Sequence, residues 1–308
     1  MPCFNPITAF KSQERTPETG RYGITFNSNN ALIEGSSFTV PCGKCQGCRV
    51  DRSREWAARC VHEAQMHDEN CFLTLTYNDE HLPPDYSISL RELQLFVKRL
   101  REHVKTKIRF FAVGEYGDLE DRPHYHLLIF NYNFPDQLLY SKKNNKPIYT
   151  SKILSQLWPL GFSTIGTVNY QTAAYCARYS MKKIGGDLAT EHYIRVHPIT
   201  GKINSVTPEF STQSRRPGLG AAWFHKYKSD VFPSDFLIVD KKKHPVPKFY
   251  LKLLAEEERK LLKRQRATPL KGNKPSTVEH RWNSSRARLR VRSEVFAAKI
   301  NKLKRDLK

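Results

Sequence analysis

Apolar and polar positions alternate with two spacings along residues 1–240, one typical of strands and one typical of amphipathic helices. Residues 71–77 are rich in β-forming side chains, which predicts a buried strand. Ser89 and Glu92 form a capping box that precedes apolar residues at helical spacing, so residues 89–104 are predicted to form an amphipathic helix.

The same patterns predict the other elements of this region. They indicate helices over residues 49–67, 151–158 and 171–184, strands over 108–114, 124–132 and 162–168, and a turn over 117–122. From residue 71 onward the predicted order is β-α-β-β-α-β-α. This order favours the α+β class, with an antiparallel sheet of the split β-α-β kind that carries its helices on one face.

Charge separates the end of the chain from the rest. The 308 residues hold 51 Lys and Arg against 30 Asp and Glu, a net charge of +21 that makes a polyanion the first candidate partner. Residues 241–308 contain 22 of these basic residues and 6 of the acidic ones. We expect a basic tail there, partly helical or disordered, which is either a phosphate-contacting arm or simply a solvated segment.

Four regions follow from these patterns. They are a cysteine-containing segment with a helix (1–70), a core (71–190), an extension of the core (191–240) and the basic tail (241–308). No run of about 18 apolar residues occurs and residues 1–10 lack the pattern of a secretory signal, so we expect a cytoplasmic protein with no membrane partner.

The sharpest chemical pattern is Pro123-His124-Tyr125-His126. Alternate residues of a strand share a face, so His124 and His126 are expected to project to the same side about 7 Å apart, with Tyr125 turned away. Glu115 lies nine residues upstream and comes alongside them if the two strands form a hairpin. Two imidazoles and a carboxylate suit Mg²⁺ or Mn²⁺ acting on a phosphate oxygen, whereas a His-x-His pair can also remain without metal.

A second pattern lies on the helix predicted over residues 171–184. Gln171, Tyr175, Tyr179 and Lys183 recur every four residues and therefore share one face. A tyrosine with a pKa near 10 becomes a nucleophile when a neighbouring cation stabilises the phenolate. The alternative is that both tyrosines are amphipathic core residues.

The third pattern is Cys42-x-x-Cys45-x-x-Cys48. Three thiols in seven residues can bind Zn²⁺ or an iron–sulfur cluster, with Cys60, Cys3 or His62 as a fourth ligand. The alternatives are that these cysteines are free thiols or have a redox role. Seven cysteines are an odd number, which favours metal binding or burial over a disulfide framework.

Together these patterns resemble the HUH superfamily of tyrosine nickases, which start rolling-circle replication. Residues 72–77, Pro123-His124-Tyr125-His126 and Tyr175-x-x-x-Tyr179 are similar to its first, metal and two-tyrosine motifs. The sequence is also similar to replication initiators of single-stranded-DNA phages of the gokushovirus kind (Microviridae). That likeness is carried by residues 41–49, 114–126 and 215–220.

The resemblance implies an endonuclease and strand-joining enzyme that nicks single-stranded DNA at an origin through a 5′-phosphotyrosine intermediate. It implies that His124, His126 and Glu115 hold the metal and that Tyr175 and Tyr179 are the nucleophiles. Tyr179-Ser180-Met181-Lys182 also fits the one-tyrosine Tyr-x-x-Lys form of the motif, which leaves open whether both tyrosines act. Residues 71–190 then correspond to the nickase core.

Partners and competing functions follow from the same reading. The sequence has no Gly-x-x-x-x-Gly-Lys-Ser/Thr motif, so we expect a separate helicase and a polymerase of the host. One alternative is a plasmid- or transposon-type initiator of the same superfamily. The other is a non-catalytic nucleic-acid-binding module whose aromatic side chains stack on bases.

Overall fold

We describe the protein from a computed structural model, which covers residues 3–17, 20–117, 121–143, 145–179, 188–196, 201, 203–232, 234–239, 241–267 and 282–302. These residues fall into two compact units. One lies within Met1–Arg52 and Pro269–Arg305, and the other lies within Ser53–Thr268. The larger unit holds the predicted histidines, the glutamate and the tyrosines, so its fold positions the candidate site.

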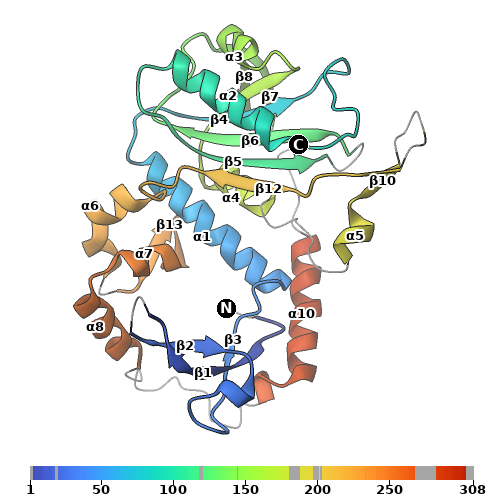
Figure 1. The fold of residues 1–308 in the computed structure, drawn as a ribbon. Helices are drawn as coiled ribbons and strands as arrows, with labels where there is room; N and C mark the ends of the chain where they lie inside the picture. Colours follow the sequence, from blue (N-terminus) through green and yellow to red (C-terminus); the bar gives the residue numbers. More distant parts are fainter. Residues whose placement is uncertain are drawn as a thin grey trace. The chain divides into compact units, whose positions relative to one another are not determined.

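A seven-stranded antiparallel sheet forms the centre of the larger unit (Figure 1). Its order is β12 (Phe210–Gln213), β5 (Arg109–Tyr116), β6 (Pro123–Phe130), β4 (Asn70–Thr76), β9 (Ser163–Gly166), β8 (Lys146–Thr150) and β7 (Leu138–Lys143). Helix α2 (Leu90–His103) joins β4 to β5, and β6 lies between these two strands. This is a split β-α-β arrangement, so the predicted α+β class with an antiparallel sheet is confirmed.

Helices cover both faces of the sheet (Figure 1). On one face α2 and α3 (Lys152–Leu157) bury Phe96 and Leu154 against Leu73 and Leu127. On the other face, α1 (Gln46–Ala64) and α4 (Tyr170–Tyr179) contribute side chains to a second core with Phe111, Val113, Leu128 and Phe130 of the sheet. The sequence patterns led us to expect helices on one face of the sheet only. The structure has α2 and α3 on one face, and α1 and α4 on the other. Residues 127–130 of β6 are all fully buried, as a strand covered on both sides requires.

Local capping interactions fix the ends of two helices that matter for the site. The Ser89 hydroxyl accepts a hydrogen bond from the Glu92 amide at 3.2 Å, so α2 begins where the capping box predicts. Asn169 caps α4 by accepting from the Thr172 amide at 3.0 Å, while the Thr172 hydroxyl accepts from the Asn169 amide at 2.9 Å. The predicted helix reached residue 184, but residues 180–184 lie outside the described residues.

The remainder of the larger unit falls into two parts. Helix α5 (Leu188–His192) and strands β10 (Ile194–Val196) and β11 (Ile203–Ser205) adjoin the first core, to which Tyr193 and Val206 belong and against which Ala189 packs. A third core is surrounded by α6 (Ala221–Val231), β13 (Phe236–Val239), β14 (Lys242–Pro245), α7 (Lys248–Leu253) and α8 (Glu256–Ala267). Tyr250, Leu254 and Leu262 are buried in this core together with Phe224. The segment expected to open a basic tail therefore supplies core residues up to α8, because aromatic and aliphatic side chains are interspersed among its lysines.

The smaller unit contains segments from both ends of the chain. Strands β1 (Ile7–Arg15), β2 (Tyr22–Thr25) and β3 (Phe38–Val40) form an antiparallel sheet of order β2-β1-β3, and a short 3₁₀ helix, η1, spans Ser28–Asn30. Helix α10 (Arg286–Asn301) brings Phe296 against Phe4, with ring centroids 5.3 Å apart. In the part of the chain that the structure describes, no helix combines the length and apolar character needed to cross a bilayer.

Candidate functional site

Glu115, His124 and His126 lie on the face of the sheet that α1 and α4 cover. Glu115 on β5 is the direct cross-strand partner of His124 on β6. The side chain of His126, two residues further along β6, lies with its Nε2 2.8 Å from Glu115 Oε1. The structure thus brings the His126 imidazole against the Glu115 carboxylate and places His124 beside Glu115 on the neighbouring strand.

Two further contacts hold the imidazole rings from outside this group. His124 Nδ1 donates to the backbone carbonyl of Arg122 at 2.6 Å, which leaves Nε2 as the nitrogen with a lone pair. His126 Nδ1 lies 3.1 Å from the hydroxyl oxygen of Thr74 on β4. A hydrogen bond on the second ring nitrogen is the usual way in which proteins orient a metal-binding histidine. Sequence reasoning missed Thr74 and Arg122.

Arg122 is itself fixed by the loop that follows β4. Its guanidinium forms an ion pair with Asp79 at 2.7 Å and donates to the backbone carbonyl of Tyr77 at 3.1 Å. The carbonyl that orients His124 therefore belongs to a residue whose side chain is held at a second point. Asp79 and Arg122 are far apart in the sequence, and only the pairing of β4 with β6 makes their contact foreseeable.

The electrostatic setting favours the neutral form of His124. His126 and Glu115 are buried, and His124 is half-buried. Burial lowers the pKa of His124, and the neighbouring His126 lowers that pKa further. Neutral imidazole nitrogens and a carboxylate are suitable ligands for Mn²⁺, so the donor set fits the divalent ion that the sequence patterns suggest.

Tyr125 anchors the strand from the opposite face. Its side chain is fully buried, and its hydroxyl accepts from the Ser89 amide at 2.6 Å and lies 2.7 Å from the Tyr77 hydroxyl. Burial raises the pKa of Tyr125 to about 12, so this phenol stays protonated. As expected from strand alternation, Tyr125 turns away from the histidines, and its contacts fix the register that places His124 and His126 on the other face.

Tyr175 on α4 lies against the histidine side of the sheet. Its ring meets the ring of His126 edge to face, with centroids 5.1 Å apart, and that of Phe72 at 6.3 Å. Phe72 stacks in turn on His126 at 5.7 Å. Tyr175 is buried, so it belongs to the second core and at the same time adjoins the metal-binding candidates. Both interpretations of this residue made from the sequence fit its position.

The remaining predicted site residues on this segment are described less fully. Tyr179 is the last residue of α4, one helical turn beyond Tyr175, and its side chain lies outside the described residues. Lys182 and Lys183 also lie outside them. The roles of these three residues stay predictions.

The cysteine pattern also forms a cluster, in the smaller unit. The sulfur atoms of Cys3, Cys42, Cys45 and Cys48 all lie within 4.8 Å of one another, and these four cysteines could hold a metal ion. Of the three candidates for the fourth ligand, Cys3 lies in this cluster, whereas Cys60 lies fully buried in the second core of the larger unit. Cys60 is too far from the cluster because Cys48 and Cys60 are twelve residues apart on one helix, which separates them by about 18 Å along the helix axis. His62 stacks on Trp223, with ring centroids 3.6 Å apart.

Residues 215–220, which carry part of the family resemblance, are held by a buried ion pair. Arg109 pairs with Glu63, and its Nη2 donates to the Pro217 carbonyl at 2.7 Å. Glu63 Oε2 accepts from the Gly220 amide at 2.7 Å. Gly220 has a positive φ of 79°, and a Cβ there would collide with the Tyr250 hydroxyl. Through these contacts, residues 215–220 help to hold α1 against strand β5 of the sheet.

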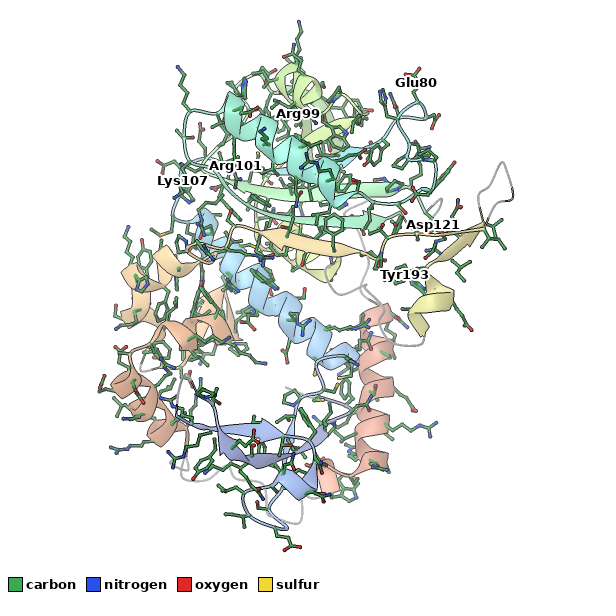
Figure 2. The ribbon with its side chains drawn as sticks, viewed as in Figure 1. Glu80, Arg99, Arg101, Lys107, Asp121 and Tyr193 are labelled. Carbon is green, nitrogen blue, oxygen red and sulfur yellow. The ribbon has the colours of Figure 1, made fainter. Side chains whose placement is uncertain are left out.

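The histidines and Glu115 lie toward one end of the sheet. Figure 2 labels Asp121, in the β5–β6 connection, and Glu80, after β4, at that end, and it labels Arg101 and Lys107 toward the other. Asp121 forms an ion pair with Arg195 of β10 at 3.3 Å. The β5–β6 connection is thereby joined to the β10–β11 hairpin.

The chain is similar to three phage proteins and to one described family. Residues 70–184 match the family described as replication-associated protein ORF2/G2P. Replication-associated protein VP4 of Bdellovibrio phage phiMH2K is 34% identical over 261 residues, which cover 81% of this chain and 76% of the relative. Replication-associated protein ORF2 of Spiroplasma virus 4 is 34% identical over 277 residues, which cover 80% and 79%.

A third relative is covered over a smaller share of its own length. Replication-associated protein ORF4 of Chlamydia phage 1 is 31% identical over 262 residues, covering 81% of this chain and 62% of that protein. No solved structure matches the chain significantly. The family-matched region, residues 70–184, contains Glu115, both histidines and both tyrosines.

Proposed function

Because the chain belongs to the family of phage replication-associated proteins, we propose that it starts rolling-circle DNA replication by nicking single-stranded DNA at an origin. The observation that carries this proposal is the packing of Tyr175 against His126, which also contacts Glu115 on the same face of the sheet. A phenol and a candidate metal ligand are thus adjacent on two rigid elements. The family assignment agrees with the resemblance to initiators of the gokushovirus kind.

In the proposed reaction a tyrosine oxygen attacks a phosphodiester of the DNA. A bond forms between the phenol oxygen and phosphorus, the bond from phosphorus to the 3′ oxygen breaks, and the phenolic proton ends on the released 3′ hydroxyl. One phosphodiester is exchanged for another, so the 5′-phosphotyrosine link retains the energy needed for rejoining. The 3′ hydroxyl is then free to prime synthesis, and resealing by the reverse step needs no nucleotide cofactor.

The candidate site residues have different roles in this reaction. Tyr175 and Tyr179 are the candidate nucleophiles, with Lys182 and Lys183 as candidate cations that favour the phenolate. His124, His126 and Glu115 would hold a divalent ion, Mg²⁺ or Mn²⁺, which as a Lewis acid neutralises charge on the phosphate oxygens. Thr74 and the Arg122 carbonyl orient the imidazoles, so that the ligands are arranged before DNA arrives.

The partners in this proposal are single-stranded DNA with its origin, and the helicase and polymerase of a bacterial host. The net charge of +21 supports attraction to the phosphate backbone. Action in the host cytoplasm follows from the same proposal.

The proposal is tested by looking for a covalent protein–DNA adduct. The full chain is incubated with single-stranded phage DNA and Mn²⁺, and the products are separated under denaturing conditions. We expect an adduct that survives denaturation, and its loss in the Tyr175→Phe/Tyr179→Phe double variant, which still binds DNA because only two hydroxyl groups are removed. DNA binding without any adduct from the unaltered protein would favour the non-catalytic binding module instead.

A matched control distinguishes the loss of a nucleophile from a general effect of replacing tyrosine by phenylalanine. Tyr140 on β7 is exposed and lies in an edge strand of the sheet. Tyr140→Phe removes the same atom from the chain and should leave adduct formation unchanged. The two single variants, Tyr175→Phe and Tyr179→Phe, then show which hydroxyl the first cleavage requires.

A further inference from the structure

Four cysteines from three parts of the smaller unit converge on one point. Cys3 precedes β1, Cys42 and Cys45 lie between β3 and α1, and Cys48 lies in the first turn of α1. Their sulfur atoms lie within 4.8 Å of one another, and those of Cys3 and Cys45 are 4.0 Å apart. Sulfur atoms bound to one zinc ion at about 2.3 Å in a tetrahedron are about 3.8 Å apart, so this spacing suits a single ion.

Backbone amides point at these sulfur atoms. The Cys42 amide donates to Cys3 Sγ at 3.2 Å, the Cys45 amide to Cys42 Sγ at 3.3 Å and the Phe4 amide to Cys45 Sγ at 3.4 Å. Amide donors stabilise negative charge on sulfur, and thiolate is the form that binds metal. Gly43 has a positive φ of 72°, which bends the chain so that the amide of Cys45 reaches Cys42.

We propose that Cys3, Cys42, Cys45 and Cys48 bind one structural Zn²⁺ ion. Four thiolates close the coordination sphere and leave no position for water or substrate, which is the arrangement of structural rather than catalytic zinc. The ion joins residue 3 to the segment between β3 and α1. It thereby fastens β1 in the sheet of a unit too small to bury a large core.

Other uses of four cysteines suit this geometry less well. Disulfides would join the thiols in pairs with sulfurs about 2 Å apart, whereas here four sulfurs surround one point. A four-iron cluster places several iron and sulfide atoms between its thiolates, and so requires wider spacing than a single ion does. This site is also separate from the proposed catalytic ion, whose ligands are imidazole and carboxylate groups.

The first test measures bound zinc in the purified full chain, produced in zinc-containing medium without chelators. We expect one zinc per chain in the unaltered protein and loss of that zinc in Cys3→Ser. Cys60→Ala is the matched control, because Cys60 was another candidate for the fourth ligand and lies buried outside the cluster. Zinc retained by Cys3→Ser but lost by Cys60→Ala would overturn the assignment, as would unaltered protein without zinc.

A second measurement does not depend on how the variants fold. X-ray absorption at the zinc edge of the unaltered protein should show four sulfur neighbours at about 2.3 Å. Nitrogen or oxygen neighbours in the first shell, or iron and inorganic sulfide in the purified protein, would overturn the proposal. Neither readout uses DNA cleavage, so the zinc site and the proposed nicking activity are tested separately.

Discussion

The Thr74 hydroxyl contacts Nδ1 of His126, and the backbone carbonyl of Arg122 accepts a hydrogen bond from Nδ1 of His124. Thr74→Val removes the hydroxyl and keeps the shape of the side chain. Loss of such a supporting hydrogen bond typically lowers metal affinity by about 10–100-fold. Titration of the protein with Mn²⁺ should show a decrease of this size, with Thr150→Val on β8 as the control. Equal affinity in both variants would contradict a supporting role for Thr74.

The ligands themselves should be more sensitive. His124→Ala and His126→Ala are expected to abolish metal-dependent cleavage, and Glu115→Gln is expected to raise the Mn²⁺ concentration needed for it. His81→Ala is the control, because His81 is exposed in the loop after β4 and contacts only Asn78 among the hydrogen bonds described. Cleavage at full rate in excess chelator would rule out this site as a metal centre.

His62 should make stability depend on pH. Burial, together with the charge of His244, lowers the pKa of His62 from 6.5 to about 3. Between these two pH values His62 is protonated in the unfolded chain but not in the folded protein. The contribution of His62 to the free energy of unfolding is therefore fully present above pH 6.5 and is lost as the pH falls toward 3. The slope contributed is about 1.4 kcal/mol per pH unit.

Urea unfolding at a series of pH values measures this slope. His62→Asn, which keeps a polar side chain facing the Tyr250 hydroxyl 2.9 Å from Nδ1, should lose it. His81→Asn serves as the control and should retain it. An unchanged pH dependence in His62→Asn would show that another group is responsible.

Strand alternation was sufficient to predict the shared face of His124 and His126 and the opposite orientation of Tyr125. It could not identify Thr74, because that contact depends on the register between β4 and β6, which the pattern along one strand does not set. Cys3 was one of several candidates for the fourth thiol. Its proximity to Cys42 results from the pairing of β1 with β3, which is equally non-local.

At the scale of elements, α1 is fastened to the sheet by the buried pair of Glu63 and Arg109. Glu63→Gln leaves the Arg109 charge buried without its partner, which typically costs about 3–5 kcal/mol. Denaturant unfolding should show this loss. Glu102→Gln breaks an exposed pair with Lys98 on α2 and should cost less than about 1 kcal/mol. Equal effects of the two substitutions would contradict a special role for the buried pair.

The central elements were predictable because their patterns are local and strong. The sequence patterns indicated β4, α2, β5, β6, α3, β9 and α4 in the right order, and Ser89 marked the start of α2. Strands β7, β8 and β12 lie toward the edges of the sheet, and they were missed. Edge strands have one pairing partner and mixed exposure, so β7 presents Leu138 and Tyr140 to solvent and shows no clear alternation.

At the scale of the whole molecule, the basic end of the chain should capture DNA through phosphate contacts. Helix α10 carries exposed Arg286, Arg290, Arg292 and Lys299. Each phosphate contact on single-stranded DNA contributes about 0.7 to the slope of log affinity against log salt. Replacing all four residues by Gln should therefore reduce this slope by up to about 3, while a short origin oligonucleotide is still nicked at saturating protein.

The control variant also replaces four basic residues by Gln, but these lie outside α10 and outside the candidate site. They are Lys11, Lys98, Lys105 and Lys142. An equal reduction of the slope in both variants would mean that attraction depends on total charge alone. An unchanged slope in the α10 variant would favour a solvated segment, the alternative weighed from the sequence. Substitution is preferable to deletion from residue 241, because Tyr250 and Leu262 belong to a core of the larger unit.

The division of the molecule could not be predicted from composition. The charge excess suggested one tail from residue 241, but α7 and α8 pack in the larger unit and α10 belongs with the N-terminal sheet. Contact between Phe4 and Phe296 joins residues at opposite ends of the chain. No local pattern encodes such a contact.

The most direct measurement of the central claim is the identity of the residue that becomes linked to DNA. The adduct formed with single-stranded origin DNA and Mn²⁺ is digested with nuclease and protease, and the peptide that carries the remaining nucleotide is sequenced by mass spectrometry. We predict a phosphotyrosyl link at Tyr175 or Tyr179 of α4, the helix that packs against His126. A link at a residue outside α4, or cleavage products without any linked peptide, would contradict the account.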